Sequence, residues 1–318
     1  MNVEALIFQQ IVDANFDQSI ATASPNNTIN VVQIAAKGSG TNIGLALTPK
    51  GTGYISAQVP DGTTTGGNAR GTRSVDFQTF RYANTQVASG ASSFLFPGEG
   101  SIAAGGNSVA GGNQSRALSA YAFAFGNVCT AENQSTFAVG NNAYASGVNS
   151  AAFGDRSQAT AKNSVAFGGL PLAYRENMLA VGTWTQFNSR GYAQGFFLPL
   201  RARTTNATPT NLIVGESAGT IINMPSGVVI NCILELIGTK SDGTAIAVYT
   251  RKIRISNVAG TTSLIGSIET IGTDQAAGTA LSVTANNTTD ALDVTVTGIA
   301  SETWNWAGFL MGVEARIS

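Results

Sequence analysis

Side chains that could carry out chemistry are few in this sequence, and they lie far apart. The chain has 318 residues and no histidine, which excludes Ser-His-Asp and Cys-His nucleophilic sites and removes the commonest zinc ligand. Asp290 and Asp293 could form a pair of catalytic carboxylates, but they flank the start of a predicted strand, where their offset places them on opposite faces. We therefore expect no catalytic residue, no metal site and no cofactor.

Two aromatic and two sulfur-containing side chains allow alternative interpretations. Trp304 and Trp306 share one face of a predicted strand, where they could form a platform for a sugar ring or pack in the core or between chains; packing is the favoured interpretation. Cys129 and Cys232 lie in different predicted modules. For the cysteines we expect two small buried side chains and no disulfide bond between them.

The composition excludes several classes of partner. Charged residues make up 11% of the chain and the net charge is −1, so the basic surface of a nucleic-acid-binding protein is absent. The sequence contains no apolar stretch of about 18 residues, the length that a membrane-spanning helix needs. Residues 1–16 lack the basic region and apolar run of a signal peptide. We expect neither a nucleic-acid partner nor membrane insertion.

A repeat between residues 101 and 170 organises the chain. A seven-residue unit recurs ten times, with alanine at every third position and a small residue at nearly every fifth position. A fixed period of this kind indicates a solenoid. Because alternate residues of a strand face opposite sides, positions one, three and five share one face that holds only small side chains. This face predicts the interior of a very thin roll.

The second and fourth positions of the unit face outward, and successive units alternate between apolar and polar pairs. The true period is therefore two units, which gives a 14-residue coil with two strands. The apolar outer residues, which we predict to form a subunit interface, are Val109, Phe123, Phe125, Phe137, Val139, Phe153, Val165 and Phe167. Burying each such side chain is worth roughly 1.5–3 kcal/mol, and three rolls around a common axis are the simplest closed arrangement.

Units such as residues 149–154 and 163–168, which read Asn-Ser-Ala-Ala-Phe-Gly and Asn-Ser-Val-Ala-Phe-Gly, resemble the head repeats of YadA-like trimeric autotransporter adhesins. The resemblance implies a left-handed parallel β-roll and a homotrimer. Those adhesins carry an export signal and a C-terminal membrane barrel. We expect this chain to have neither.

The segments before the repeat are predicted to attach and extend the protein. Residues 1–30 form a predicted N-terminal attachment segment, with a short amphipathic helix that ends before Pro25; a docking peg or trimeric coil and a frayed terminus remain alternatives. The helical spacing is that of Val3, Leu6, Ile7 and Ile11. Residues 31–100 alternate with period two between Gly-rich turns, which predicts a shaft of short β repeats or a β-prism.

Parts of this shaft resemble bacteriophage tail fibres. Residues 41–53 read Thr-Asn-Ile-x-Leu-x-Leu-x-Pro-Lys-Gly-Thr-Gly, a module common in those fibres. Residues 67–71, followed by 75–78 and 86–90, resemble the junction that the fibres place before their repeats.

The residues after the repeat divide into two predicted segments. Residues 171–201 form a transition that caps the roll, and residues 202–318 form an antiparallel β-sandwich that serves as the tip domain. Residues 204–210, 290–298 and 304–307 resemble the C-terminal β domain of many phage tail fibres. The expected fold is thus all-β: a trimeric, left-handed parallel β-roll with a 14-residue coil, followed by a C-terminal antiparallel β-sandwich.

These patterns favour a homotrimeric bacteriophage tail fibre, a receptor-binding protein of the virion that is made in the host cytoplasm and is not an enzyme. Its expected partners are tail or baseplate proteins at the N-terminal end and a host surface polysaccharide or outer-surface protein at the tip. Loops of the tip are predicted to contact the receptor, through Ser241, Asp242, Asn286 and Asn287. One alternative is a trimeric bacterial surface adhesin, which requires an export signal. Another is a polysaccharide-degrading tailspike, which requires separated or paired carboxylates in one cleft.

Overall fold

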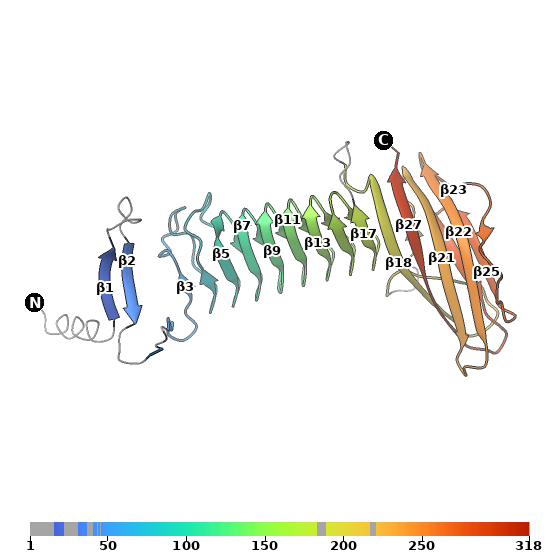
Figure 1. The fold of residues 1–318 in the computed structure, drawn as a ribbon, viewed down its shortest axis with the longest axis horizontal. Coiled ribbons are helices and arrows are strands. Elements are labelled where there is room, and N and C mark those ends of the chain that lie inside the picture. Colours follow the sequence, from blue (N-terminus) through green and yellow to red (C-terminus); the bar gives the residue numbers. More distant parts are fainter. Residues whose placement is uncertain are drawn as a thin grey trace, which may run out of the picture. The chain divides into compact units, whose positions relative to one another are not determined.

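The computed structural model describes residues 16–21, 31–36, 41–42, 44, 46–182, 189–216 and 221–317. The chain forms two units, Met1–Gly51 and Thr52–Ser318. The described residues form strands and turns (Figure 1). They contain no helix, and so none that is long and apolar enough to cross a membrane. The expectation of an all-β protein is confirmed.

In the first unit, β1 (Phe16–Ala21) and β2 (Val31–Ala36) form an antiparallel pair. The four apolar residues on which the helix prediction rests lie outside the described residues.

The second unit begins with a parallel β-solenoid. One of its sheets contains, in chain order, β7 (Val109–Asn113), β9 (Phe123–Asn127), β11 (Phe137–Asn141), β13 (Ala151–Asp155), β15 (Val165–Gly168) and β17 (Leu179–Gly182). The other sheet contains β6 (Ile102–Ala103), β8 (Arg116–Ala117), β10 (Thr130–Ala131), β12 (Tyr144–Ala145), β14 (Gln158–Ala159) and β16 (Leu172–Ala173). Each strand is hydrogen-bonded in parallel to the equivalent strand of the next coil, as in Phe123 to Phe137 and Thr130 to Tyr144. The 14-residue coil with two strands is confirmed.

Small side chains fill the space between these two sheets. The alanines at the third position of every unit are fully buried, and so are most serines at the first position. Several buried hydroxyl groups bond to the backbone, as when the Ser101 hydroxyl donates to the Gly112 carbonyl at 2.9 Å. The small-residue face predicted from strand parity is therefore the interior of the roll.

The corners of the roll depend on left-handed backbone conformations that recur in every seven-residue unit. Such conformations are uncommon outside glycine, with asparagine among the exceptions. The amide of each corner residue donates to a carbonyl of the preceding coil, for example Asn142 to Asn127 at 2.7 Å. The corner residues, with φ of 52–60°, are Asn107, Gln114, Tyr121, Val128, Ser135, Asn142, Asn149, Arg156, Asn163, Leu170 and Asn177.

The parallel ladder extends further toward the N-terminus than the strict repeat. β3 (Ile55–Ser56), β4 (Val75–Asp76) and β5 (Phe94–Glu99) pair in parallel with one another, and β5 pairs with β7. The register partners Ile55, Val75 and Phe94 are spaced more widely along the chain than the partners within the roll, so these coils are longer than those of the roll. In the described part of residues 52–100, the three short strands continue the solenoid, because they hydrogen-bond to one another and β5 hydrogen-bonds to β7 of the roll.

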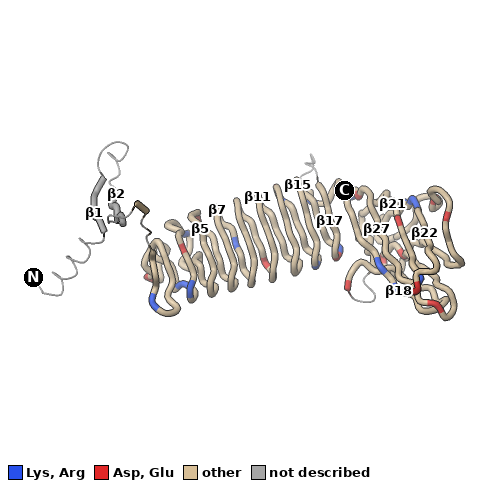
Figure 2. The backbone as a smooth tube through the Cα atoms, turned by 60° about the horizontal axis from the view of Figure 1, so that its bottom comes forward, with Lys and Arg blue, Asp and Glu red and all other residues tan. Residues whose placement is uncertain are grey.

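A buried ionic cluster lies in these first coils. Asp76 is fully buried between two arginines, with Arg70 Nε at 2.7 Å and Arg81 Nη2 at 3.0 Å from its Oδ2 atom. Arg81 also donates to the Gln78 carbonyl at 2.9 Å. Figure 2 shows that charged residues are otherwise sparse along the roll.

The roll joins the C-terminal domain through continuous sheet hydrogen bonding. β17 pairs antiparallel with β18 (Ala193–Thr204), so the sheet changes from parallel to antiparallel at this point. β17 and the first residues of β18 lie within residues 171–201, the segment predicted as a transition. Beside the joint, Glu314 is buried and accepts hydrogen bonds from Arg175 Nη1 and the Tyr174 hydroxyl, both at 2.8 Å.

The C-terminal domain is an antiparallel sandwich, as predicted. The long sheet continues through β18, β27 (Trp304–Arg316), β21 (Val228–Lys240), β22 (Ile246–Val258) and β23 (Thr261–Leu264), with β24 (Glu269–Thr270) beside β22. The second sheet contains β19 (Thr210–Asn211), β20 (Ile222–Asn223), β25 (Ala280–Asn286) and β26 (Ala291–Thr297).

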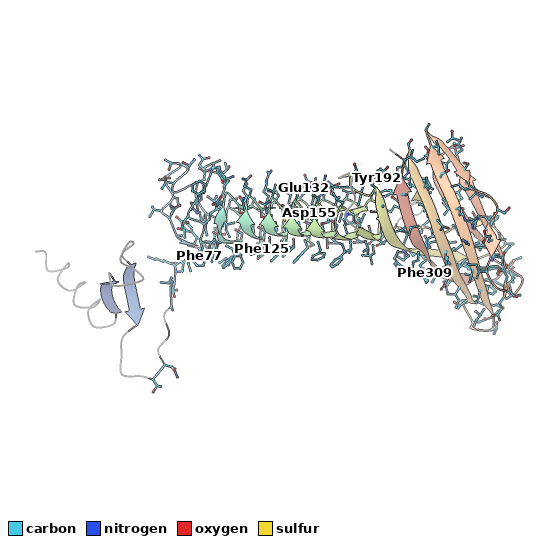
Figure 3. The ribbon with its side chains drawn as sticks, turned by 45° about the horizontal axis from the view of Figure 1, so that its top comes forward. Phe77, Phe125, Glu132, Asp155, Tyr192 and Phe309 are labelled. Atoms are coloured by element: carbon cyan, nitrogen blue, oxygen red, sulfur yellow. The ribbon has the colours of Figure 1, made fainter. Side chains whose placement is uncertain are left out.

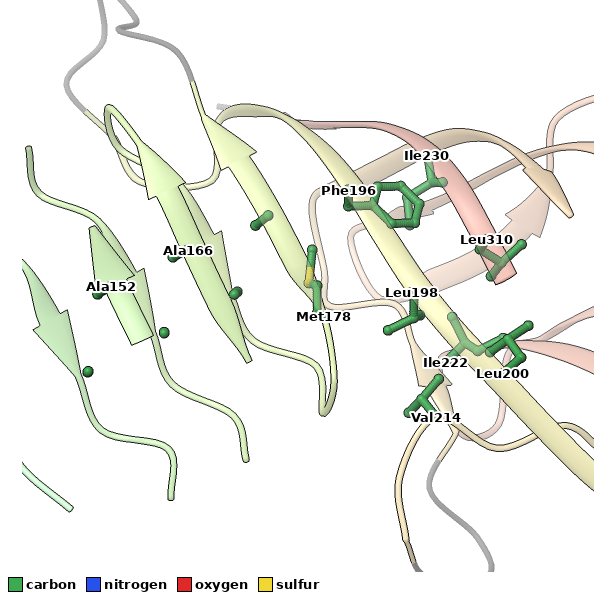
Figure 4. Packing of buried hydrophobic residues seen from close by; sticks show 14 of the residues in the cluster. Ala152, Ala166, Met178, Phe196, Leu198, Leu200, Val214, Ile222, Ile230 and Leu310 are labelled. Atoms are coloured by element: carbon green, nitrogen blue, oxygen red, sulfur yellow. The ribbon is translucent and has the colours of Figure 1, made fainter. Parts of the chain in front are cut away.

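Figure 4 shows how the core changes along the second unit. Ala152 and Ala166 fill the roll, whereas Leu198, Leu310 and Ile222 fill the space between the sheets of the sandwich. The larger side chains are possible because paired sheets of a sandwich lie about 10 Å apart.

Candidate functional site

The predicted interface residues lie together on the outer face of one sheet. They project from β7, β9, β11, β13 and β15, on the side opposite to the buried alanines. Ring centroids are 4.4 Å apart for Phe123 and Phe137, 5.3 Å for Phe137 and Phe153, and 6.2 Å for Phe153 and Phe167. These contacts join the side chains into one continuous column, which we call the apolar face.

A single chain leaves the apolar face open to solvent. Phe125 is 40% exposed and Phe167 is 57% exposed, and the remaining members are half-buried or exposed. A contiguous apolar surface of this kind marks a site of interaction in soluble proteins. The structure brings all eight predicted residues together; their role as a subunit interface stays a prediction.

The apolar face begins earlier than the repeat suggested. Phe94 contacts Phe77 at a centroid distance of 5.8 Å and Phe96 at 4.5 Å, and Phe96 contacts Phe125 at 5.8 Å. The spacing of seven does not reach these residues, because the first coils are longer. The sequence did contain a signal for this extension: Phe94 and Phe96 alternate around Leu95. Because Leu95 is fully buried, the two phenylalanines face outward. Figure 3 shows Phe77 and Phe125 on one side of the molecule and Glu132 on the other.

The opposite face of the roll is polar. Its outward residues include Arg116, Thr130 and Gln158, and the Tyr144 hydroxyl donates a hydrogen bond to Glu132. The hydrogen bond to Glu132 is the largest cause that raises the pKa of Tyr144. The roll therefore has one apolar and one polar outer surface, as the alternation of the units predicted.

An amide ladder borders the apolar face. Asn127 Nδ2 donates to Asn141 Oδ1 at 2.7 Å, and Asn141 Nδ2 donates in turn to Asp155 Oδ1. Each of these residues ends a strand of the same sheet and projects from the same side as the phenylalanines. The ladder links these polar side chains from coil to coil, and it favours the in-register stacking of coils.

The predicted receptor residues belong to two separate turns. Ser241 and Asp242 lie in the turn before β22, and Asn287 contacts Thr262 just beyond the other end of β22, where its Oδ1 accepts the Thr262 amide at 2.6 Å. A strand of the length of β22 spans about 40 Å. The structure therefore does not bring the two pairs into one site; whether either binds a receptor stays a prediction.

Internal hydrogen bonds hold both turns. Asp242 Oδ1 accepts the hydroxyl and the amide of Thr244 at 2.6 and 2.9 Å, and the Thr244 hydroxyl is the main cause that lowers the pKa of Asp242 to about 2. Asn286 Oδ1 accepts the amides of Thr288 and Thr289 at 3.0 and 3.1 Å. These bonds shape the turns and occupy part of the polar surface available to a ligand.

The two tryptophans are core residues. Trp304 is fully buried and Trp306 nearly so, and their rings stack with centroids 5.9 Å apart. Their indole nitrogens donate to Glu302 and Thr204, at 3.0 and 3.2 Å. The alternative of an exposed sugar platform is therefore wrong, because both rings face the sandwich interior.

The remaining candidates for chemistry have structural partners. Asp290 accepts the Thr262 hydroxyl at 2.7 Å, and Asp293 accepts Asn286 Nδ2 at 2.9 Å. Cys129 and Cys232 are buried free thiols, as expected, and burial raises the pKa of Cys232 to about 12. Within the described ranges, no group of three or more aspartate, glutamate or cysteine side chains is arranged to hold a metal ion.

Comparison with known families identifies the repeat. The YadA head domain repeat matches residues 97–118, 131–157 and 145–170. The matched residues form most of the coils that carry the apolar face, so the roll contains YadA head repeats. A search of curated proteins found no significant match.

Three phage proteins are among the solved structures to which the chain is similar. Tailspike protein gp49 from Acinetobacter baumannii bacteriophage Fri1, a capsular polysaccharide depolymerase, aligns with 75% of this chain and 44% of its own, at 10% identity and a TM-score of 0.23. The tailspike protein of Acinetobacter baumannii phage AM24 aligns with 81% of this chain and 48% of its own, at 9% identity and a TM-score of 0.25. The tailspike protein of Acinetobacter phage vB_ApiP_P1 aligns with 83% of this chain and 46% of its own, at 11% identity and a TM-score of 0.21. The chain spans less than half of these chains, and TM-scores this low do not establish a common fold.

Proposed function

We propose that the protein is a homotrimeric receptor-binding fibre of a bacteriophage tail, which attaches the virion to the surface of the host cell. The observation that carries this proposal is the apolar face of the roll, a surface that a single chain leaves exposed over every coil. YadA head repeats in the same coils support a trimeric, surface-binding protein. The resemblance of residues 41–53 and of the C-terminal domain to tail-fibre modules supports a place on a phage tail.

The geometry of the face supports a closed assembly, of which three chains around one axis are the simplest form. Its apolar side chains repeat at every coil along the roll, so the contact has to continue in the same direction. Subunits that pack around an axis parallel to the roll satisfy this condition and form a closed assembly. Burying a phenylalanine or valine contributes roughly 1.5–3 kcal/mol, so several coils together stabilise the trimer.

In this proposal the N-terminal segment binds tail or baseplate proteins, the solenoid forms the shaft, and the sandwich contacts a surface polysaccharide or outer-surface protein of the host. Three tips on one fibre act together, so a weak contact at each tip suffices for firm attachment. The mechanism is recognition without catalysis. Asp76 and Glu314, the buried carboxylates of the described residues, are each bound by arginine and are therefore engaged in structural ion pairs.

Binding to whole cells tests the proposal. Fluorescently labelled full-length protein, added to a panel of bacterial strains, is expected to coat susceptible strains and to reduce phage adsorption to them. The proposal would be contradicted if the protein bound to none of the strains that are infected by the phage that carries it. Antibodies against the protein should label phage tails; labelling of the bacterial surface in uninfected cells would favour the alternative of a bacterial adhesin.

The enzymatic alternative is tested separately. Surface polysaccharide from a strain that binds the protein is incubated with it, and new reducing ends are measured. We expect no increase over a heat-inactivated sample. Release of reducing ends would show that the protein is a polysaccharide-degrading tailspike.

A further inference from the structure

The sandwich has an unusual outer surface on one of its two sheets. The outward residues of β18, β27 and β21 are largely apolar, and Met311 and Val313 are 51% and 58% exposed. By contrast, the outward residues of the other sheet are polar, as in Ser282 and Thr284 on β25. An antiparallel sheet that faces water on one side carries polar residues there. Only the second sheet fits that rule.

This surface continues the apolar face of the roll without a break. In the hydrogen-bonded register, Val165 neighbours Leu179, Leu179 neighbours Phe197, and Phe197 neighbours Met311. Met311 in turn neighbours Ile233. All of these side chains project from the same side of one sheet, and Figure 3 shows Phe309 on the same side as Phe77 and Phe125.

The shape and charge of the surface suit packing between unlike halves of the same face. Two hollows of about 360 Å³ each lie between the projecting side chains, one beside Ile237 and Phe309 and the other beside Val181 and Val313. Glu235 lies on the β21 side of the surface, and no ion pair of Glu235 occurs among the described residues. Arg201 and Arg203 lie toward the other side, on β18. Around a threefold axis, different halves of one face meet, so projections and hollows, and opposite charges, can pair.

We propose that the outer face of the β18–β27–β21 sheet packs against the same domain in the two other copies of this chain, so that the subunit interface runs from the first coils of the roll through the sandwich. This inference rests on the proposed trimer. It leaves the second sheet and the turns at the ends of the sandwich as the surface that faces the host.

Methionine oxidation tests the proposal, because the chain contains a natural probe. It has four methionines; Met178 and Met224 are buried within their own chain, whereas Met311 is exposed unless another copy covers it. The full-length protein is treated with dilute hydrogen peroxide, which converts accessible methionine to the sulfoxide. Mass spectrometry of peptides then gives the rate for each residue. A Thr284→Met variant supplies an exposed control on the other sheet.

We expect Met311 to react as slowly as Met178 and Met224, on the order of tenfold slower than the methionine introduced by Thr284→Met. In the Phe125→Asp, Phe153→Asp variant, which should dissociate the trimer, Met311 should react as fast as that control. Slow oxidation of Met178 and Met224 in the same sample shows that the variant is folded.

The native mass of each sample separates the two proposals. A trimer in which Met311 reacts rapidly overturns this inference and leaves the proposed function standing; a partner of another kind would then have to cover the surface. A folded monomeric variant in which Met311 stays slow also overturns it, because protection would come from within the chain. A wild-type monomer overturns both proposals.

Discussion

At the scale of single residues, the roll depends on side chains that are small enough for its interior and on backbone that can turn its corners. Ala138 and its equivalents in every coil are fully buried, and a larger side chain there would overpack a closely filled core. Glycines play a second part near the ends of the longer strands, where successive coils approach each other closely.

Gly140 provides a residue-scale prediction. Its φ is 133°, and a Cβ atom at this position would lie 2.3 Å from the Gly154 carbonyl oxygen of the next coil. Gly140→Ala is therefore expected to lower the free energy of unfolding by at least about 2 kcal/mol, because strained backbone and a backbone contact are both added. Urea denaturation followed by circular dichroism measures the loss.

Gly106→Ala is the matched control. Its added Cβ would have its nearest neighbour at 3.8 Å, the Ala91 carbonyl oxygen, so the same chemical change should alter stability by less than about 0.5 kcal/mol. Equal effects of the two substitutions would show that the coils do not approach each other as described.

Much of the residue-scale picture was predictable from the sequence. The period of seven and strand parity identified the buried alanines and the eight outward-facing apolar residues of the roll. The left-handed corners were missed, although asparagine at 107, 142, 149, 163 and 177 was a usable signal. Tyr121, Val128 and Leu170 could not have been found in this way, because hydrogen bonding to the preceding coil imposes a conformation that these residues rarely adopt.

At the scale of elements, the joint between roll and sandwich holds the two parts in one continuous sheet. The backbone bonds of β17 and β18 are reinforced by the buried side chains of Arg175 and Glu314 and by the partly buried Tyr174. Burial is the main cause that raises the pKa of Tyr174. Arg175 Nε also donates to the Asn223 carbonyl at 3.0 Å, so the cluster connects the roll to the second sheet of the sandwich as well.

Glu314→Gln tests the joint. The substitution leaves the buried Arg175 without its counter-charge, and breaking a buried ion pair from one side costs about 3–5 kcal/mol. The expected result is a clear decrease in the midpoint of thermal unfolding, measured by calorimetry.

The control for the joint is Glu216→Gln. Glu216 pairs with Lys162 at 2.6 Å, but the two side chains are 64% and 39% exposed, and surface pairs of this kind contribute about 1 kcal/mol or less. If Glu314→Gln is as mild as this control, the buried cluster does not stabilise the joint.

The sequence predicted the elements less evenly than the residues. Within the strict repeat, a single offset of two units determines the register of every strand. Outside the strict repeat, this fixed offset no longer predicts the register. The strands β3, β4 and β5 are spaced more widely along the chain, and β18 pairs with β17 in the antiparallel direction. The longer coils were therefore not apparent, and neither was the extension of the apolar face to Phe77 and Met311.

At the scale of the whole molecule, the second unit presents one apolar face from the roll to the sandwich, with polar residues on the opposite outer surface of the roll. A folded single chain does not cover that face. The proposed trimer does, and the proposed attachment function depends on it, because three joined tips are what converts weak contacts into firm binding.

The native mass of a variant pair tests this central claim most directly. Phe125 and Phe153 project outward from β9 and β13, so Phe125→Asp with Phe153→Asp should leave the single chain folded and place charges in the proposed interface. The matched control is Thr130→Asp with Gln158→Asp. These residues lie on the polar face of the roll, in β10 and β14, the strands that follow β9 and β13 along the chain.

Light scattering after size exclusion under native conditions gives the masses. The wild type and the polar-face variant should each have three times the chain mass of 32.6 kDa, and the apolar-face variant should have the mass of one chain. An apolar-face variant that remains trimeric, or a wild type that is a monomer, would contradict the assignment of the apolar face as the trimer interface.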